Sequence, residues 1–145
     1  MSSTRFTVHT TLSPSDVLTL LTDFGPERSR RWPNIDESHF QVHDQGDGWA
    51  EVTEGNGMGW ERERYAWDAS AGTVTVDTLD SNLWGPGSSW HYELTPAGSG
   101  TDVHVTLHRV PRSFRGRIVG ALIPVVGART LGRQLETVLR HAESL

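Results

Sequence analysis

The chain contains no cysteine among its 145 residues. This absence excludes disulfides, thiolate metal ligands and a cysteine nucleophile. Lysine is also missing, because all 13 Lys or Arg positions are arginine, and this excludes a Schiff-base mechanism. No apolar run reaches the roughly 18 residues that a membrane-spanning helix needs, and the N-terminus lacks the apolar core of a signal peptide. We therefore expect a cytoplasmic protein without a membrane span.

Charge is distributed unevenly along the chain. The formal net charge is −5, but residues 1–100 hold 6 arginines and 15 acidic residues, whereas residues 101–145 hold 7 arginines and 3 acidic residues. A nucleic-acid-binding protein needs a broad basic face to neutralise phosphates, so the acidic body argues against a nucleic-acid partner. The length and a hydrophobic content of 35% fit one globular domain over residues 1–145.

The N-terminal part predicts a strand followed by two short helices. Residues 5–12 alternate between apolar and polar side chains, which is typical of a β-strand. Residues 13–16 have the composition of a helix start, because Ser13 suits the N-cap and Pro14 suits the first helical position. A short helix is expected to follow, with a second helical segment over residues 27–31.

Six further strands are expected in the middle of the chain. The segments between them are rich in Gly, Pro, Asn and Asp, which favour turns. Short connections between successive strands predict an antiparallel meander. The expected strands cover residues 38–44, 48–54, 58–68, 73–81, 88–95 and 102–110.

The C-terminal segment 113–143 has apolar residues at helical spacing, which predicts one long helix. Pro124 lies within this helix and should cause a kink or a local break. An antiparallel sheet must cover its apolar face, and one long helix can do so if the sheet curls around it. The sequence therefore predicts an α+β fold, in which a curved seven-stranded antiparallel sheet wraps around this helix and encloses a cavity for an apolar small molecule.

These elements resemble the START-related superfamily, also called SRPBCC, and its polyketide cyclase/dehydrase-like branch. The resemblance covers nearly the whole chain and implies a helix-grip fold. The superfamily includes lipid carriers, hormone-receptor-like proteins, aromatases and cyclases, so the resemblance implies no single activity and transfers no catalytic residue. It is carried by the glycine-containing C-terminal helix and by the segments 12–17 (LSPSDV), 21–24 (LTDF), 32–35 (WPNI), 90–96 (WHYELTP) and 100–103 (GTDV).

The segment 60–67 alternates glutamate and arginine in an unusual way. On a strand, Glu61, Glu63, Tyr65 and Trp67 share one face. The two aromatic residues indicate that this face points inward, which would bring Glu63, and with it Glu61, to the cavity wall. A carboxyl group against aromatic rings has a raised pKa and can act as a general acid or base. The alternative is that these carboxylates form cross-strand ion pairs with arginine.

Two residues on later strands share the inward parity and carry polar groups. Arg109 could hold a ligand carboxylate or carbonyl, or it could pair with Glu63. Tyr92 could orient a ligand oxygen through its hydroxyl group. Two functions therefore stay open. The domain either binds a lipid, isoprenoid or polyketide-like compound, or it is an enzyme of the cyclase, aromatase or dehydratase kind. In such an enzyme Glu63 would move a proton while Arg109 and Tyr92 polarise a carbonyl.

Aromatic side chains dominate the expected ligand-binding set. Six tryptophans exceed the needs of a small core, so several should line the cavity or its mouth. Trp84 precedes Gly85-Pro86-Gly87 and is a candidate gate on a mobile loop, or else it closes the end of the sheet. The expected ligand-binding residues are Trp60, Glu63, Tyr65, Trp67, Trp84, Trp90, Tyr92, Arg109, Ile118 and Leu122.

Four arginines gather where the long helix begins: Arg109, Arg112, Arg115 and Arg117. The helix dipole disfavours cations at this end. The cluster therefore indicates an anionic partner, such as a ligand phosphate or a membrane surface, unless it only balances the acidic sheet. A third function, an interaction module that uses the Arg109–Arg117 basic cluster, follows from the first of these interpretations.

Metal and cofactor sites are not expected. His104 and His108 are four residues apart on a predicted strand, a spacing of about 13 Å, which is too far for one ion. The glycine-rich segment 55–59 leads into a strand, so it predicts a hairpin turn instead of a phosphate-binding loop. We expect no cofactor, and the sequence leaves open whether the chain forms a homodimer.

Overall fold

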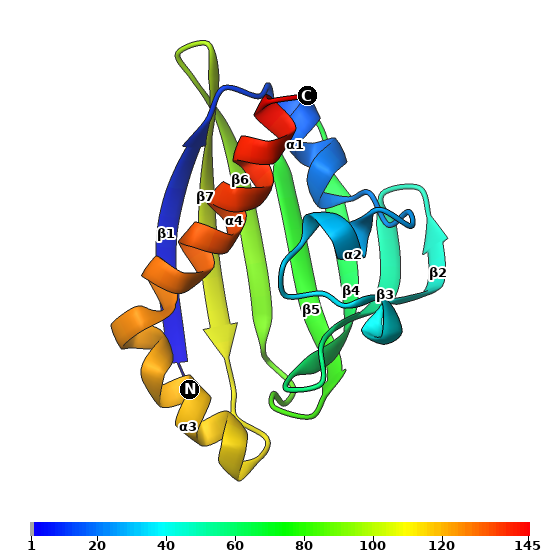
Figure 1. Cartoon of the computed structure of the whole chain (residues 1–145), viewed down its shortest axis with the longest axis vertical. Helices are drawn as coiled ribbons and strands as arrows, with labels where there is room; N and C mark the ends of the chain where they lie inside the picture. Colours follow the sequence, from blue (N-terminus) through cyan, green and yellow to red (C-terminus); the bar gives the residue numbers. More distant parts are fainter. Residues whose placement is uncertain (1) are drawn as a thin grey trace.

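A curved antiparallel sheet forms one layer of the structure, and the helices cover one of its faces (Figure 1). The computed structural model describes residues 2–145. The seven strands lie in the order β1-β7-β6-β5-β4-β3-β2, which confirms the predicted meander and fold class. The strands are β1 (Ser2–Thr10), β2 (Gln41–Gly46), β3 (Trp49–Gly55), β4 (Trp60–Asp68), β5 (Thr73–Ser81), β6 (Ser89–Ala97) and β7 (Gly100–Arg109).

Two short helices follow β1, as the sequence predicts: α1 (Pro14–Leu21) and α2 (Arg28–Arg31). The Oγ of Ser13 accepts a hydrogen bond from the backbone N–H of Asp16 at 3.2 Å, so Ser13 is the N-cap of α1. Val17 and Leu21 point from α1 into the core. α1 lies near the end of the sheet opposite α3, whereas α2 lies in front of the middle of the sheet (Figure 1).

The predicted break at Pro124 is present in the C-terminal helical segment. It divides into α3 (Phe114–Leu122), a π-helical turn over Ile123–Gly127, and α4 (Ala128–Glu143). Proline has no N–H to donate to the α-helical ladder, and the wider turn accommodates this defect. α4 packs along β1, whereas α3 lies at the end of the sheet (Figure 1). No described helix is long and apolar enough to cross a membrane.

One predicted strand begins too early. The sequence predicts a strand over 38–44, but Glu37–His39 form a 3-10 turn and β2 begins at Gln41. The carboxylate of Asp36 accepts a hydrogen bond from the backbone N–H of His39 at 2.9 Å. A side chain that accepts a hydrogen bond from the nearby backbone in this way stabilises a turn instead of pairing with a neighbouring strand.

The inward-facing residues of β6 and β7 form the apolar centre of the sheet. Trp90 lies opposite Leu107, and Leu94 lies opposite Val103. Leu94, Val103 and Leu107 are buried, as strict alternation of inward and outward side chains requires. A second small cluster, which includes Leu83 and Leu107, packs against Ile123 of the π-helical turn.

A glycine lets α3 approach the segment that follows β5. A Cβ atom at Gly116 would collide with the carbonyl oxygen of Leu83. The same carbonyl oxygen accepts a hydrogen bond from the backbone N–H of Arg112 at 2.9 Å, so it cannot move away freely. Backbone therefore touches backbone at this contact, and only glycine allows it.

Replacement of Gly116 by alanine should therefore destabilise the fold. We expect Gly116→Ala to lower the free energy of unfolding by about 1–3 kcal/mol, the usual cost of inserting a group into a packed contact. Gly132→Ala on α4 is the matched control, because its Cβ would lie at an ordinary 3.6 Å from Phe6. The control should gain up to about 1 kcal/mol from helix propensity. Urea unfolding curves of both variants test this, and equal effects would contradict the close contact.

Candidate functional site

A cavity of about 870 Å³ lies between the sheet and the C-terminal helical segment. Its sheet side is formed by residues of β3 to β7, and its helix side is mainly apolar. Met58, Leu122 and Val126 line the cavity and are also exposed. They locate its mouth between the β3–β4 turn and the helical segment that begins with α3.

Arg28 of α2 is fixed at one side of the cavity. Its side chain is only 3% exposed, and its Nε donates a hydrogen bond to Glu54 of β3. Its Nη2 donates to the hydroxyl oxygen of Tyr65 at 3.0 Å, and that hydroxyl donates to Glu54 at 2.7 Å. Burial opposes the charge of Arg28, but the Glu54 carboxylate outweighs it and keeps the pKa of Arg28 above its ordinary value. The arginine is therefore a fixed charge, neutralised by one glutamate.

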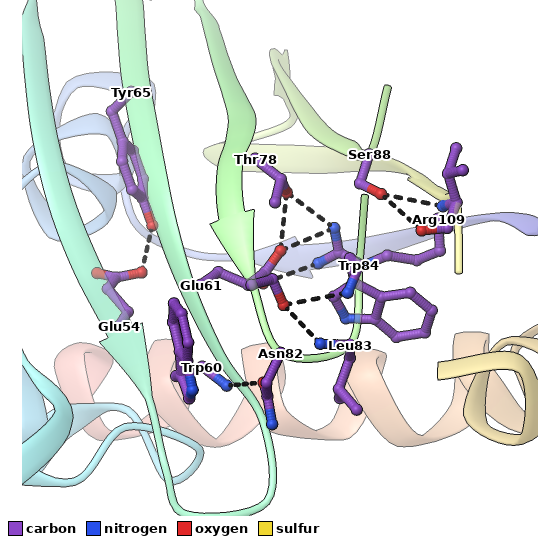
Figure 2. Close-up of polar contacts among 12 residues, drawn as sticks. Glu54, Trp60, Glu61, Tyr65, Thr78, Asn82, Leu83, Trp84, Ser88 and Arg109 are labelled. Atoms are coloured by element: carbon purple, nitrogen blue, oxygen red, sulfur yellow. Dashed lines mark hydrogen bonds and ion pairs between the residues drawn. The ribbon is translucent and has the colours of Figure 1, made fainter. Parts of the chain in front are cut away.

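Arg109 at the end of β7 forms a second buried ion pair (Figure 2). Its two terminal nitrogens lie 3.1 Å from the two carboxylate oxygens of Glu61 on β4, a bidentate arrangement. The hydroxyl group of Thr78 donates to Glu61 at 2.8 Å and lies within 3.4 Å of the guanidinium. The guanidinium also lies over the rings of Trp84 and Trp90, at 5.3 and 4.9 Å from their centroids.

Glu63 lies between these two ion pairs on β4 and lines the same cavity. It is 4% exposed, and its side chain makes no hydrogen bond with another described residue. Burial raises the pKa of Glu63 well above its usual range, and the nearby carboxylates of Glu61 and Glu54 raise it further. Because both arginines are already paired, Glu63 is the carboxyl group in this wall that most readily holds a proton.

Two further polar groups in the wall lack a described protein partner. The indole N–H of Trp32 is buried without a hydrogen-bond acceptor. The hydroxyl group of Tyr92 on β6 also makes no hydrogen bond with a described residue. Both residues line the cavity. A buried polar group without a partner costs free energy, so Tyr92 and Glu63 mark where a bound molecule could offer oxygen atoms, and the enclosed N–H of Trp32 could join them after a small side-chain shift.

Seven of the ten expected ligand-binding residues lie in the cavity wall. They come from four strands or connections and from α3, so the fold brings together positions that are far apart in sequence. The seven residues are Glu63, Tyr65, Trp84, Trp90, Tyr92, Arg109 and Leu122.

Three expected residues lie outside the wall of this cavity. Trp60 alternates with Glu61 along β4 and so belongs to the opposite face of the strand. Trp67 has the inward parity, but it packs against Phe24, with ring centroids 6.3 Å apart, in the main core beyond the cavity. Ile118 lies on the solvent side of α3 and is 52% exposed.

Two role assignments also change. Of the two alternatives for Trp84, the structure favours closure of the sheet end over a mobile gate, because Trp84 is buried and its backbone N–H donates to the Oγ of Ser81 at 3.2 Å. The Arg109–Arg117 cluster divides, because Arg109 points into the cavity and Arg112 pairs with Asp80. Of the four arginines, only Arg115 and Arg117 remain exposed without an ion pair to a described residue.

Sequence reasoning missed Arg28, Trp32 and Glu54. For Glu54 a signal was present, since Ala50, Val52 and Glu54 share the buried parity of β3. A glutamate at an inward position implies a buried cation, but it does not identify which arginine supplies the charge. Arg28, the partner of Glu54, and Trp32 could not be identified from local spacing. Both residues belong to a segment without strand or helix periodicity.

No known family model matches the chain, and no curated protein matches it by sequence. Among solved structures, the chain is similar to the ZhuI aromatase/cyclase from a Streptomyces species, with 16% identity, 97% of this chain and 93% of that chain covered, and a TM-score of 0.80. It is also similar to a START superfamily protein from Mycobacterium smegmatis, with 13% identity and a TM-score of 0.74; the match covers 98% of this chain and 99% of that chain.

A third similar structure is the di-domain aromatase/cyclase StfQ from the steffimycin biosynthetic pathway. Its identity is 13% and its TM-score 0.73; the match covers 99% of this chain and 51% of that one, so this chain corresponds to about half of StfQ. At such low identities a structural match shows the fold and not the activity. The chain has the helix-grip fold of the START-like proteins, and its structural neighbours include aromatase/cyclases.

Proposed function

We propose that the cavity binds an uncharged, mainly apolar small molecule that carries oxygen atoms. The observation that supports this most strongly is the set of three polar groups in the wall, on Trp32, Glu63 and Tyr92, that have no described protein partner. A pocket that is mostly apolar with a few convergent polar groups is typical of small-molecule sites. The volume of about 870 Å³ suits a molecule of several fused rings or a folded chain.

The two walls of the cavity differ in chemistry. The wall formed by the C-terminal helical segment is mainly apolar and includes Leu122, Ile123 and Leu131. Apart from Arg115 of α3, the charged and aromatic polar side chains of the wall lie on the strands and on the segment around α2. A flat molecule with oxygen atoms along one edge would satisfy both walls, whereas a plain hydrocarbon would leave the three polar groups unpaired.

The charge balance of the wall favours a neutral ligand. Arg28 is paired with Glu54 and Arg109 with Glu61, so neither guanidinium is free to neutralise a ligand carboxylate. In the interior of the cavity an anionic ligand would have to displace one of these glutamates or lie beside Glu63, where further negative charge is unfavourable. Arg115 also lines the cavity, but it lies on α3 and is exposed, so solvent screens its charge. This argument favours a carbonyl or hydroxyl partner for Arg109 over a carboxylate.

Two matched probes test this preference. Danthron is a neutral dihydroxyanthraquinone, and rhein is the same ring system with a carboxylate. We expect danthron to quench the fluorescence of the tryptophans in the wall on binding, and rhein to bind at least about tenfold more weakly because it adds an unpaired charge. Equal or tighter binding of rhein, or no binding of either probe, would contradict the proposal.

Substitutions at Glu63 provide the control. Glu63→Gln keeps a hydrogen-bond donor, so danthron should bind to it about as tightly as to the native chain. Glu63→Leu removes the donor and should weaken binding by about tenfold, the value of one hydrogen bond to a buried group. Glu136→Leu changes an exposed glutamate of α4 and should leave binding unchanged.

Acid–base catalysis is a second candidate function, and Glu63 is the observation that favours it. A buried carboxyl group with a raised pKa can act as a general acid or base. Tyr92 and Arg109 line the same cavity and could polarise a carbonyl group near Glu63. Two structural neighbours are named as aromatase/cyclases, which supports this candidate by analogy.

Proton exchange in an enolisable probe tests this candidate directly. In D2O, we expect the domain to accelerate deuterium exchange at the carbon between the two carbonyls of benzoylacetone, followed by NMR. A general base typically contributes a factor of about 100 to 10,000, so Glu63→Gln should lose most of the acceleration. Exchange that is unaffected in Glu63→Gln would remove Glu63 from any proton transfer, while binding of danthron would still stand.

The dependence of stability on pH follows from the raised pKa of Glu63. The folded protein holds the Glu63 proton at pH values where the unfolded chain has lost it, so stability falls as pH rises from about 4.5 through the folded pKa. The slope is at most about 1.4 kcal/mol per pH unit. Glu63→Gln cannot ionise and should become increasingly more stable than the native chain over this range, as measured by urea unfolding. If the free energies of unfolding of the two proteins changed with pH in the same way, this would contradict a buried, protonated Glu63.

A further inference from the structure

The solvent side of α3 and of the π-helical turn carries large apolar side chains. Phe114 and Val125 are 78% and 77% exposed, and Ile118 and Leu122 are about half exposed. Phe114, Ile118 and Leu122 recur every four residues, which places them on one side of the helix. A contiguous exposed apolar surface of this kind usually marks an interaction site. We refer to Phe114, Ile118, Leu122 and Val125 as the α3 surface.

The inner side of α3 explains why the apolar residues face outward. Gly116 and Gly120 are the buried residues of this helix, and Gly116 packs directly on the backbone of Leu83. The helix therefore attaches to the domain through its smallest residues and turns its largest residues to solvent. This is the reverse of an ordinary surface helix, whose apolar side faces the core.

Arginine side chains border the α3 surface. Arg115 and Arg117 follow Phe114 on either side of the apolar stripe, and Arg129 lies just beyond the π-helical turn. All three are exposed, and none makes an ion pair with a described residue. The sequence has no acidic residue between Asp102 and Glu136. The surface is therefore apolar in the middle and positively charged at its borders.

The same surface continues into the mouth of the cavity. Leu122 belongs to the α3 surface and lines the cavity, and Arg115 also lies in the cavity wall. Met58 completes the rim from the β3–β4 turn and is 76% exposed. A partner bound to the α3 surface would thus lie directly against the opening.

We propose that the α3 surface docks the domain onto a membrane that contains anionic lipids, with the cavity mouth facing the lipid. A helix that exposes bulky apolar side chains bordered by arginine presents the two groups that an interfacial membrane anchor uses, an apolar surface to insert and positive charge beside it. The charged borders match the negative headgroups, to which each arginine near the surface adds attraction. This docking needs no ligand in the cavity, so it stands or falls separately from the function proposed above.

A second copy of the chain fits this surface less well. In a two-fold dimer the same patch meets itself. Arg115, Arg117 and Arg129 of one copy would then approach those of the other, and the segment offers no acidic residue to separate them. A lipid surface avoids this repulsion, because it supplies both an apolar phase and negative charge.

Co-sedimentation with vesicles tests the proposal. We expect the full chain to bind vesicles of phosphatidylcholine mixed with phosphatidylserine, to bind phosphatidylcholine vesicles weakly, and to lose binding as salt is raised. The double variant Phe114→Ser/Ile118→Ser should abolish binding, because it removes the inserted side chains. Arg117→Gln/Arg129→Gln should weaken binding by about fivefold for each arginine. These residues are exposed, and unchanged thermal unfolding would verify that the variants fold.

Two matched controls change the same residue types elsewhere. Leu145→Ser removes an apolar side chain that is 89% exposed at the chain end opposite α3 (Figure 1). Arg64→Gln removes an exposed arginine of β4 that lies over Trp49. Both should bind vesicles like the native chain.

Three outcomes would overturn the proposal. The first is equal binding to vesicles with and without phosphatidylserine. The second is equal loss of binding in the controls and in the α3 variants. The third is a dimer in light scattering that dissociates in Phe114→Ser/Ile118→Ser while the native chain ignores vesicles, since the surface would then be a contact between two copies.

Discussion

The pairing of each buried arginine with one glutamate is the constraint on which the cavity depends. A guanidinium cannot lose its charge, so Arg28 and Arg109 can stay buried only if a carboxylate compensates each of them. Glu54 and Glu61 do this from neighbouring strands, β3 and β4. Removing one member of such a pair typically costs about 3–5 kcal/mol, because the other charge is left buried alone. The two pairs therefore join α2 to β3 and the end of β7 to β4.

The same pairing determines the chemistry of what remains. Arg28 and Arg109 are each paired with a glutamate, whereas the third carboxyl group in the wall, that of Glu63, forms no ion pair. Burial raises the pKa of Glu63 and so favours its neutral form, which can donate a hydrogen bond. The site thus combines a fixed, charge-balanced frame with a few unpaired polar groups, and this combination distinguishes it from a plain apolar core.

The sequence was sufficient for most of the fold and for part of the site. Alternation and turn residues predicted the strands closely, with β5 at the expected residues 73–81, because each signal is local. Strand parity correctly brought Glu63 and Arg109 to one face. It could not identify Glu61 as the partner of Arg109, because that choice depends on the bulge in register between β4 and β5. Arg28 was beyond reach, since α2 has no periodicity that locates it over Glu54.

The close contact of Gly116 with Leu83 also links the rim of the cavity to its interior. The backbone of Leu83 is held by Arg112, and the next residue, Trp84, covers the guanidinium of Arg109. The π-helical turn at Pro124 separates α3 from α4, which stays packed on β1. The contact therefore places α3 one residue away from the tryptophan that covers the buried ion pair. A side chain larger than glycine at position 116 would push on Leu83 and so disturb the packing over Arg109 as well.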